Sequence, residues 1–285
     1  MSKAVDKMCI EGIVGYLEVN DPDLKDIKPI LNGLEQIGHK IDLTSYEPTK
    51  VSKLHMATIL GETELVKELI QNGNQVNCQT RKKISPLLLA VFLDRHEIVT
   101  LLLESGANPN QISEPYFETP FQMAVIWGKR LAIEMMLDHG ADLESKVGTG
   151  CSVLHLAIKY EQIEIAKFLM KRGVHVNSTD NVLQTPLHLA VILRRYEIIP
   201  SLLDYEANTN TTNYRKSTPL QIATKYCLRE AMEILMKSGA CLRQKNENGE
   251  IPLELCLTSI GYGYSLEPLT KIAQKALKSF AYNLH

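Results

Sequence analysis

Apolar and polar positions follow one pattern that returns about every 33 residues. In six of its seven copies the pattern opens with Ser or Thr, which is often followed by Pro, and it continues with apolar residues. It reads SKLHMA at 52, SPLLLA at 85, TPFQMA at 119, SVLHLA at 152, TPLHLA at 185, TPLQIA at 218 and IPLELC at 251, in steps of 33 or 34 residues. A fixed period of this length predicts a stacked array in which each repeat buries its apolar face against the next.

Each period predicts two helices. The Ser or Thr can accept hydrogen bonds from free N–H groups at a helix start, and Pro suits the first helical position. About two turns later, HEIVTLLLESGAN (96–108) and EQIEIAKFLMKRGV (161–174) carry apolar residues at helical spacing. Each run includes a Gly at which the chain can leave the helix by a left-handed turn.

The repeated phrase resembles the TPLHLA signature of ankyrin repeats, and SGANPN, HGADLE and RGVHVN are similar to that family's GADVN ending. The resemblance covers residues 51–260. It implies an all-α ankyrin-repeat solenoid of paired antiparallel helices with β-turn fingers and helical caps. In that family, the fingers and first helices form a concave face on which partners are commonly held.

The two ends of the chain keep helical spacing of apolar residues without the signature. We therefore expect residues 1–50 to form N-terminal capping helices or a degenerate repeat, and residues 261–285 to form a C-terminal capping helix.

The repeat at 185–217 departs from the family pattern three times. Arg194 occupies the usual Gly position between the helices, Pro200 falls near the start of the second helix, and Glu206 replaces the Gly that ends it. A non-Gly residue in a left-handed turn is strained. We expect this repeat to be less protected than the one before it.

Composition limits the classes of partner. The chain has 31 basic and 33 acidic residues and a net charge of -2, which gives no global field to attract nucleic acid or an anionic membrane. No apolar run approaches the roughly 20 residues needed to cross a bilayer. We expect a protein or peptide partner, no nucleic acid, no membrane insertion and a monomer in the free state.

Two fingers are basic, through Arg81, Lys82 and Lys83 in one and through Arg215 and Lys216 in the other. The sequence leaves open whether they are solvated loops or contact phosphate or an acidic peptide.

The six cysteines are spaced singly, without the pairs typical of metal sites or the density of a secreted disulfide scaffold. This spacing favours a reducing compartment, and we expect a cytoplasmic protein with a nuclear pool left open.

No motif indicates catalysis. His55, His155 and His188 occupy the same position in three repeats, where the ankyrin resemblance implies that the imidazole links neighbouring turns. The chain lacks H-E-x-x-H, a phosphate-binding glycine loop and G-x-S-x-G. We predict no enzyme, no catalytic residue, no metal and no cofactor, although a Cys–His pair assembled in space stays open.

Asn77, Asn110 and Asn177 each lie eight residues after a Leu. The resemblance implies possible hydroxylation by a cytosolic oxygenase, whereas the residue type alone fits an ordinary turn. The sequence does not decide between the two.

The residues that follow the signature are unusually apolar and aromatic, and in ankyrin proteins this position lies towards the concave face. Our candidate partner-binding residues are Leu93, Trp127, Tyr160, Leu193 and Tyr226, joined by Tyr116, Phe117 and Tyr214 on the fingers. A contiguous exposed row of this kind would mark a partner site. The alternative, that the row packs within the array, stays open.

We therefore predict a non-catalytic protein–protein interaction module, acting as an adaptor, scaffold or inhibitor. The alternative is a substrate receptor of a ubiquitin ligase, because residues 265–277 resemble the first helix of a suppressor-of-cytokine-signalling box. Thr270 stands where that motif usually has Cys, and the sequence does not identify a partner or pathway.

Overall fold

A computed structural model describes residues 51–80, 83–113, 118–252 and 254–255. The described elements are helical, as predicted. The chain divides into two compact units, residues 1–142 and 143–285. The expected capping segments 1–50 and 261–285 lie outside the described residues, as do Arg81, Lys82, Tyr116 and Phe117.

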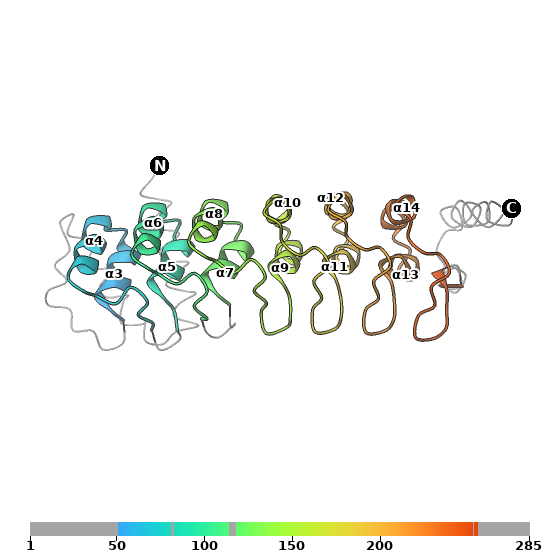
Figure 1. Cartoon of the computed structure of the whole chain (residues 1–285), viewed down its shortest axis with the longest axis horizontal. Coiled ribbons are helices and arrows are strands. Elements are labelled where there is room, and N and C mark those ends of the chain that lie inside the picture. The colour runs from blue at the N-terminus through green and yellow to red at the C-terminus, as the bar shows by residue number, and fades with distance from the viewer. Residues whose placement is uncertain (1–50, 81–82, 114–117, 253, 256–285) are drawn as a thin grey trace. The chain divides into compact units, whose positions relative to one another are not determined.

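Each unit is built from helical pairs stacked side by side (Figure 1). Unit 1 contains α3 (Lys53–Leu60) and α4 (Thr63–Gln71), α5 (Pro86–Phe92) and α6 (His96–Glu104), and α7 (Pro120–Ile126) and α8 (Arg130–Asp138). Unit 2 contains α9 (Val153–Lys159) and α10 (Ile163–Lys171), α11 (Pro186–Ile192) followed by a 3-10 turn (Tyr196–Ile198) and α12 (Ile199–Asp204), and α13 (Pro219–Lys225) and α14 (Arg229–Lys237).

The first helix of each pair begins where the signature predicts. Ser85, Thr119, Thr185 and Thr218 accept a hydrogen bond from the backbone N–H three residues later, and Pro follows each of them in the first turn. These caps satisfy donors that a helix start otherwise leaves without partners. Most residues of these first helices are buried, so each forms the interior layer of its repeat.

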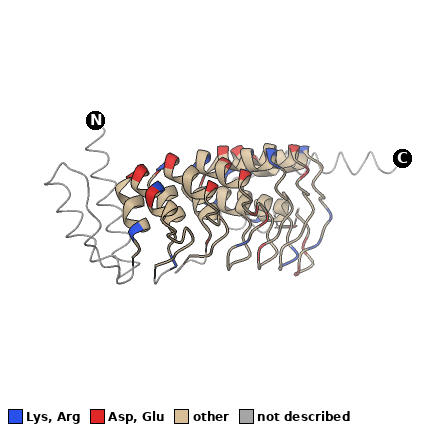
Figure 2. Ribbon diagram, turned by 60° about the vertical axis from the view of Figure 1, so that its left-hand side comes forward, with Lys and Arg blue, Asp and Glu red and all other residues tan. Residues whose placement is uncertain are grey.

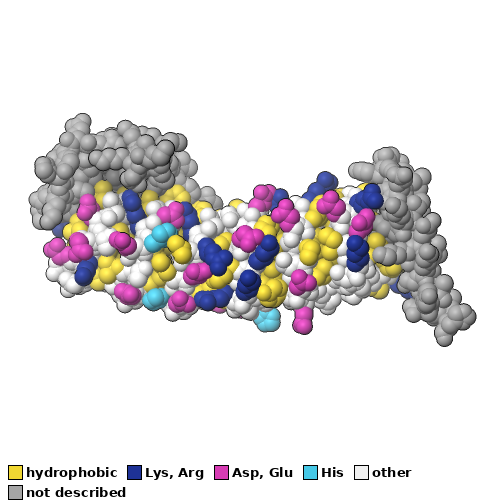
Figure 3. Space-filling model, turned by 90° about the horizontal axis from the view of Figure 1, so that it is seen from above, with side chains coloured by type: hydrophobic (Ala, Val, Ile, Leu, Met, Phe, Trp, Pro, Cys, Tyr) yellow, Lys and Arg dark blue, Asp and Glu magenta, His cyan; other side chains and the backbone are white. Residues whose placement is uncertain are grey.

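The second helices have one buried and one charged face. Ile165, Ala166 and Leu169 of α10, for example, are buried, while Arg130–Glu134 on α8 forms an ion pair at i,i+4 spacing. Acidic and basic residues are interspersed along the helices (Figure 2). The view onto the second helices shows acidic, basic and hydrophobic side chains mixed over that face (Figure 3).

The fingers are tight turns, as the ankyrin resemblance implied. In the finger at 213–217, Asn213 N–H donates to the Ser217 carbonyl at 3.0 Å, and Lys216 N–H donates back to the Asn213 carbonyl at 2.9 Å. The Asn213 side-chain oxygen accepts from the N–H groups of Arg215 and Ser217, both at 3.0 Å. An Asn or Asp at this position fixes the turn because its side chain bonds backbone donors two and four residues later.

The repeat at 185–217 keeps the strained positions noted in the sequence. Arg194 and Glu206 have φ angles of 58° and 64°, so neither turn is rebuilt to avoid the left-handed region. Pro200 lies in the first turn of α12 and has no N–H to donate. The second helix is accordingly split into a 3-10 turn and a six-residue α-helix, whereas α10 in the preceding repeat is a continuous helix of nine residues.

We expect backbone amides in the second helix of the 185–217 repeat to exchange with solvent faster than those of α10. The split helix has fewer regular hydrogen bonds. It also ends at Glu206 in left-handed backbone, where the preceding repeat has Gly173, and a non-Gly residue there costs roughly 1–2 kcal/mol. Hydrogen exchange followed by mass spectrometry checks this, and equal or slower exchange in 196–204 would contradict it.

Candidate partner-binding surface

Five of the candidate residues share one structural position. Leu93, Trp127, Tyr160, Leu193 and Tyr226 are each the C-terminal cap residue of a first helix. Each backbone N–H completes the helix, so the side chain alone is available for other contacts. Their surroundings differ between the two units.

In unit 1 this position is partly buried. Leu93 and Trp127 pack against a cluster of buried residues that includes Met56, Leu89 and Met123. The Trp127 ring lies against Phe92 of the preceding repeat, with ring centroids 4.7 Å apart and planes tilted by 56°. Offset or tilted aromatic pairs of this kind stabilise the packing between repeats.

In unit 2 two of the three residues at this position, Tyr160 and Tyr226, reach solvent. Tyr160 is 44% exposed and Tyr226 is 56% exposed, and on α11 the exposed residue is Ile192 at 38% rather than its neighbour Leu193, which is half-buried. Tyr214 on the finger is 53% exposed. Large apolar side chains that are scattered singly are normal, but a contiguous group marks a candidate binding surface.

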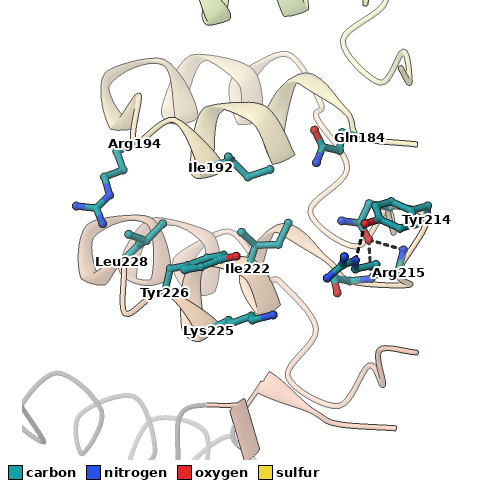
Figure 4. Close-up of a pocket in the computed structure, with 11 residues that line it drawn as sticks. Gln184, Ile192, Arg194, Tyr214, Arg215, Ile222, Lys225, Tyr226 and Leu228 are labelled. Atoms are coloured by element: carbon teal, nitrogen blue, oxygen red, sulfur yellow. Dashed lines mark hydrogen bonds between the residues drawn. The ribbon is translucent and has the colours of Figure 1, made fainter. Parts of the chain in front are cut away.

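A groove in unit 2 gathers several of these residues (Figure 4). It has a volume of about 390 Å³ and lies between α11, α13 and the finger at 213–217. Its wall residues include Ile192, Arg194, Tyr214, Arg215, Lys225 and Tyr226. We call this the unit 2 groove.

Backbone hydrogen bonds hold the fingers of unit 2 to one another. Asn181 N–H donates to the Thr149 carbonyl, Tyr214 N–H to the Val182 carbonyl, and Glu247 N–H to the Arg215 carbonyl, each at 3.1 Å. Successive fingers therefore form a ladder, which fixes the finger wall of the groove.

Each exposed tyrosine of this surface lies beside a cation. The Lys159 Nζ is 5.5 Å from the Tyr160 ring centroid, and the Lys225 Nζ is 5.8 Å from the Tyr226 ring centroid. The Arg215 guanidinium lies 5.2 Å from the Tyr214 ring centroid, and its Nε donates to the Tyr214 hydroxyl at 2.5 Å. Cation–π contacts favour these arrangements, so the surface is both aromatic and positively charged.

Sequence reasoning did not place Arg194 in a binding surface, and at the end of α11 it selected Leu193 rather than its neighbour Ile192. Arg194 was identified only as a departure from Gly, yet its left-handed turn brings it to the groove wall. No periodic signal could reveal this, because the wall combines the turn after α11 with a finger and the end of α13. The one sequence signal that pointed to this groove was the basic pair Arg215 and Lys216 on the finger.

The histidine position is structural, as expected. The Nε2–H of His188 donates to the Ser217 carbonyl at 3.1 Å, because a carbonyl can only accept. Its Nδ1 accepts from the Thr185 hydroxyl at 2.9 Å and from the Thr185 N–H at 3.2 Å. His155 makes the matching contacts with Ser152 and the Gln184 carbonyl. Each imidazole thus joins a helix cap to the next finger.

A cysteine and a histidine do approach one another in unit 1. The Cys78 Sγ is 3.8 Å from His55 Nδ1 and 3.2 Å from the Ser52 hydroxyl. Burial raises the pKa of the Cys78 thiol, which disfavours the thiolate that a nucleophile needs. His55 Nδ1 also lies 2.8 Å from the hydroxyl of Ser52, the cap residue of its own helix. Ser52, His55 and Cys78 therefore form a helix-capping arrangement rather than a catalytic pair.

The three asparagines form bridges between neighbouring loops. The Asn177 amide donates to the Glu206 carbonyl at 3.1 Å, and its oxygen accepts from the Asn208 N–H at 2.8 Å. Asn77 bridges to residues 106 and 108, and Asn110 bridges to residues 140 and 142, in the same way. These contacts account for asparagine at this position without hydroxylation.

We expect Asn177→Ala to lower the free energy of unfolding of unit 2 by about 1 kcal/mol, because two exposed hydrogen bonds are lost. Asn177→Asp should have a smaller effect, since a carboxylate keeps the acceptor and loses the donor. Glu144 already accepts in this manner from His175 N–H at 2.8 Å. Urea unfolding followed by circular dichroism measures both free energies of unfolding. An Asn177→Asp variant less stable than Asn177→Ala would contradict this prediction.

Two further observations concern other classes of site. Among the described residues, His, Cys, Asp and Glu side chains do not gather in groups of three that could hold a metal ion. Within the same ranges, every helix is too short or too polar to cross a lipid bilayer.

Comparison with known proteins gives a consistent match. The family model described as "Ankyrin repeats (3 copies)" matches residues 26–113, 54–147, 110–180, 133–213 and 178–246. A putative ankyrin repeat protein of fowlpox virus, FPV031, is 32% identical over 139 residues, which cover 48% of this chain and 41% of that protein. The chain spans less than half the length of this and two other curated relatives that it matches.

Solved structures show the same fold. The ankyrin repeat domain of Bcl-3, described as a unique member of the IkappaB protein family, aligns with a TM-score of 0.71 and 25% identity over 78% of this chain and 98% of that domain. The human ASB11 ankyrin repeat domain aligns with a TM-score of 0.60 and 28% identity, covering 72% of this chain and 91% of that domain.

Proposed function

The chain belongs to the ankyrin repeat family, and on that premise we propose that it is a non-catalytic module that binds a protein or peptide partner. Ankyrin repeats form protein-interaction surfaces, and one scaffold serves many ligands, so the particular surface must identify the kind of partner. We assign the contact surface to the first-helix ends and fingers of unit 2.

The observation that carries this proposal is the exposed apolar and aromatic group in unit 2. Tyr160, Ile192 and Tyr226 lie on successive repeats, and Tyr214 extends the group onto a finger. In unit 1 the equivalent Leu93 and Trp127 are engaged in packing. We therefore leave these two residues outside the proposed contact set, together with half-buried Leu193.

The proposed setting is the cytoplasm. Cys78, Cys151, Cys227 and Cys241 are free thiols among the described residues, which fits a reducing compartment. Their single spacing in the sequence points the same way.

Affinity purification of the full chain tests the function. Wild-type protein should capture a specific partner from a cell extract, and Tyr160→Ala with Tyr226→Ala should reduce that capture about tenfold or more, since central aromatic residues often dominate binding. The matched control replaces Leu131 and Tyr205, which are similarly exposed on second-helix segments.

Equal loss in the control variant would point to nonspecific adhesion. Capture of elongin-type subunits, independent of the two tyrosines, would instead support the ubiquitin-ligase alternative. Capture unchanged in the Tyr160 and Tyr226 variant would place the contact surface elsewhere.

A further inference from the structure

The unit 2 groove has a charge of one sign. Among the described residues that line it, Arg194, Arg215 and Lys225 are basic and none is acidic. Arg194 and Arg215 lie at opposite ends of the view, with Ile192 and Tyr226 between them (Figure 4). A cleft lined by one sign of charge concentrates ligands of the other sign, so the groove favours negatively charged groups at both ends.

The middle of the groove is apolar. Ile192 and the Tyr226 ring are exposed at its surface, and Ile222 and Leu228 are buried beneath them. The volume of about 390 Å³ lies within the roughly 300–1,000 Å³ of sites that enclose small ligands. This space suits one large side chain of a peptide and its immediate neighbours.

The groove is held in place before any partner arrives. Asn213 fixes the finger through two hydrogen bonds, and the Ser217 carbonyl accepts from His188 of α11. Tyr214 and Arg215 are also joined by their side chains. Preorganisation of this kind lowers the entropy cost of binding a flexible chain.

The neighbouring charges favour a peptide over a polyanion. Glu247 lies close enough to Arg215 to raise its pKa, after the larger effect of the Tyr214 hydroxyl. Hydrogen bonds from Asn246 and Asn248 lower the pKa of Glu250, with a smaller contribution from Lys225, so Glu250 is ionised at neutral pH. Two carboxylates beside the groove would repel the dense charge of a nucleic acid but tolerate separate carboxylates placed against the arginines.

We propose that the unit 2 groove binds an extended acidic peptide segment, in which an aromatic or large aliphatic side chain is flanked by Asp or Glu. The anchor side chain packs on Ile192 and Tyr226, and the flanking carboxylates pair with Arg215 and Lys225 on one side and Arg194 on the other. This inference rests on the proposed function and specifies the chemistry of the partner.

Selection from a random-peptide display library on the immobilised full chain tests the proposal. Enriched peptides should carry Asp or Glu around an aromatic or aliphatic residue. Enrichment of basic or uncharged sequences, or no enrichment, would overturn it.

An enriched peptide, labelled with fluorescein, should then bind in solution. Tyr226→Ala should weaken its affinity about tenfold or more, and Arg215→Gln should weaken it severalfold while reducing the salt dependence. The matched controls are Tyr205→Ala, an equally aromatic site after α12, and Lys171→Gln at the end of α10, which should each change affinity less than about twofold.

Circular dichroism confirms that each variant is folded. Equal weakening in the control variants, or tighter binding of single-stranded oligothymidine than of the peptide, would overturn the assignment. If the affinity purification above captures a partner through Tyr160 and Tyr226 but no acidic peptide binds, the proposed function stands and this inference fails.

Discussion

Replacement of His188 by Gln is expected to remove much of the acid sensitivity of unit 2. Burial lowers the pKa of His188 to about 4, against an ordinary value of 6.5. The Ser217 carbonyl and Asp180 raise this pKa by a smaller amount, and the neighbouring His155 lowers it slightly further. Between these two values the unfolded chain binds the proton and the folded chain does not. Stability is therefore fully present above pH 6.5 and is lost as pH falls towards 4.

The size of the effect follows from the two pKa values. The contribution of His188 to the free energy of unfolding should fall by about 2 kcal/mol at pH 5 and by about 3 kcal/mol at pH 4. The structural cause is specific, because protonated Nδ1 would point a hydrogen at the Thr185 N–H that it now accepts from.

Glutamine is the right substitute because the array already uses it. Gln221 occupies the same position, accepts from Thr218 N–H at 2.9 Å and donates to the carbonyls of Gln244 and Glu250. Urea unfolding of His188→Gln should give wild-type stability at pH 7 and a smaller loss at pH 5. Since His155 also has a lowered pKa, His155→Gln should act similarly, whereas exposed His175→Gln is the control. Identical acid profiles for wild type and His188→Gln would refute this account.

Trp127→Ala should destabilise unit 1 by about 2–3 kcal/mol, the second large effect. The substitution removes the ring that packs against Phe92 and leaves the apolar cluster beneath it uncovered. Large-to-small changes at fully buried aromatic sites cost roughly 3–5 kcal/mol, and Trp127 is only partly buried.

Tyr160→Ala is the matched control, because Tyr160 occupies the same cap position in unit 2 and is exposed. It should cost less than about 1 kcal/mol. Urea unfolding followed by far-ultraviolet circular dichroism avoids dependence on the chain's single tryptophan. Comparable destabilisation by the two substitutions would mean that burial at this position does not differ as described.

The helices could be predicted because their signals are local. A capping Thr, a Pro in the first turn and apolar spacing act within a few residues, and Thr185–Pro186 begins α11 where the pattern indicated. The exposure of the cap residues could not be predicted in this way. Trp127 and Tyr160 carry the same positional signal, and their burial depends on neighbours from other repeats.

The groove was beyond sequence reasoning for a related reason. Its cations come from the turn at Arg194, the finger at Arg215 and the helix end at Lys225, which are separated along the chain. Only the repeat stacking brings them together. The left-handed φ angle of Arg194 is also not indicated by any sequence pattern, apart from the absence of the usual glycine at this position.

The finger ladder limits how this protein could be altered by insertion or deletion. Three fingers of unit 2 each bond the previous finger through a backbone N–H at the same turn position, at Asn181, Tyr214 and Glu247. One added residue in the finger at 213–217 would shift its donor out of line with Val182 and its carbonyl out of line with Glu247, so two junctions would be lost together. Loop grafting in unit 2 therefore requires exchange at constant length, with sequence diversity confined to side chains such as Tyr214 and Arg215.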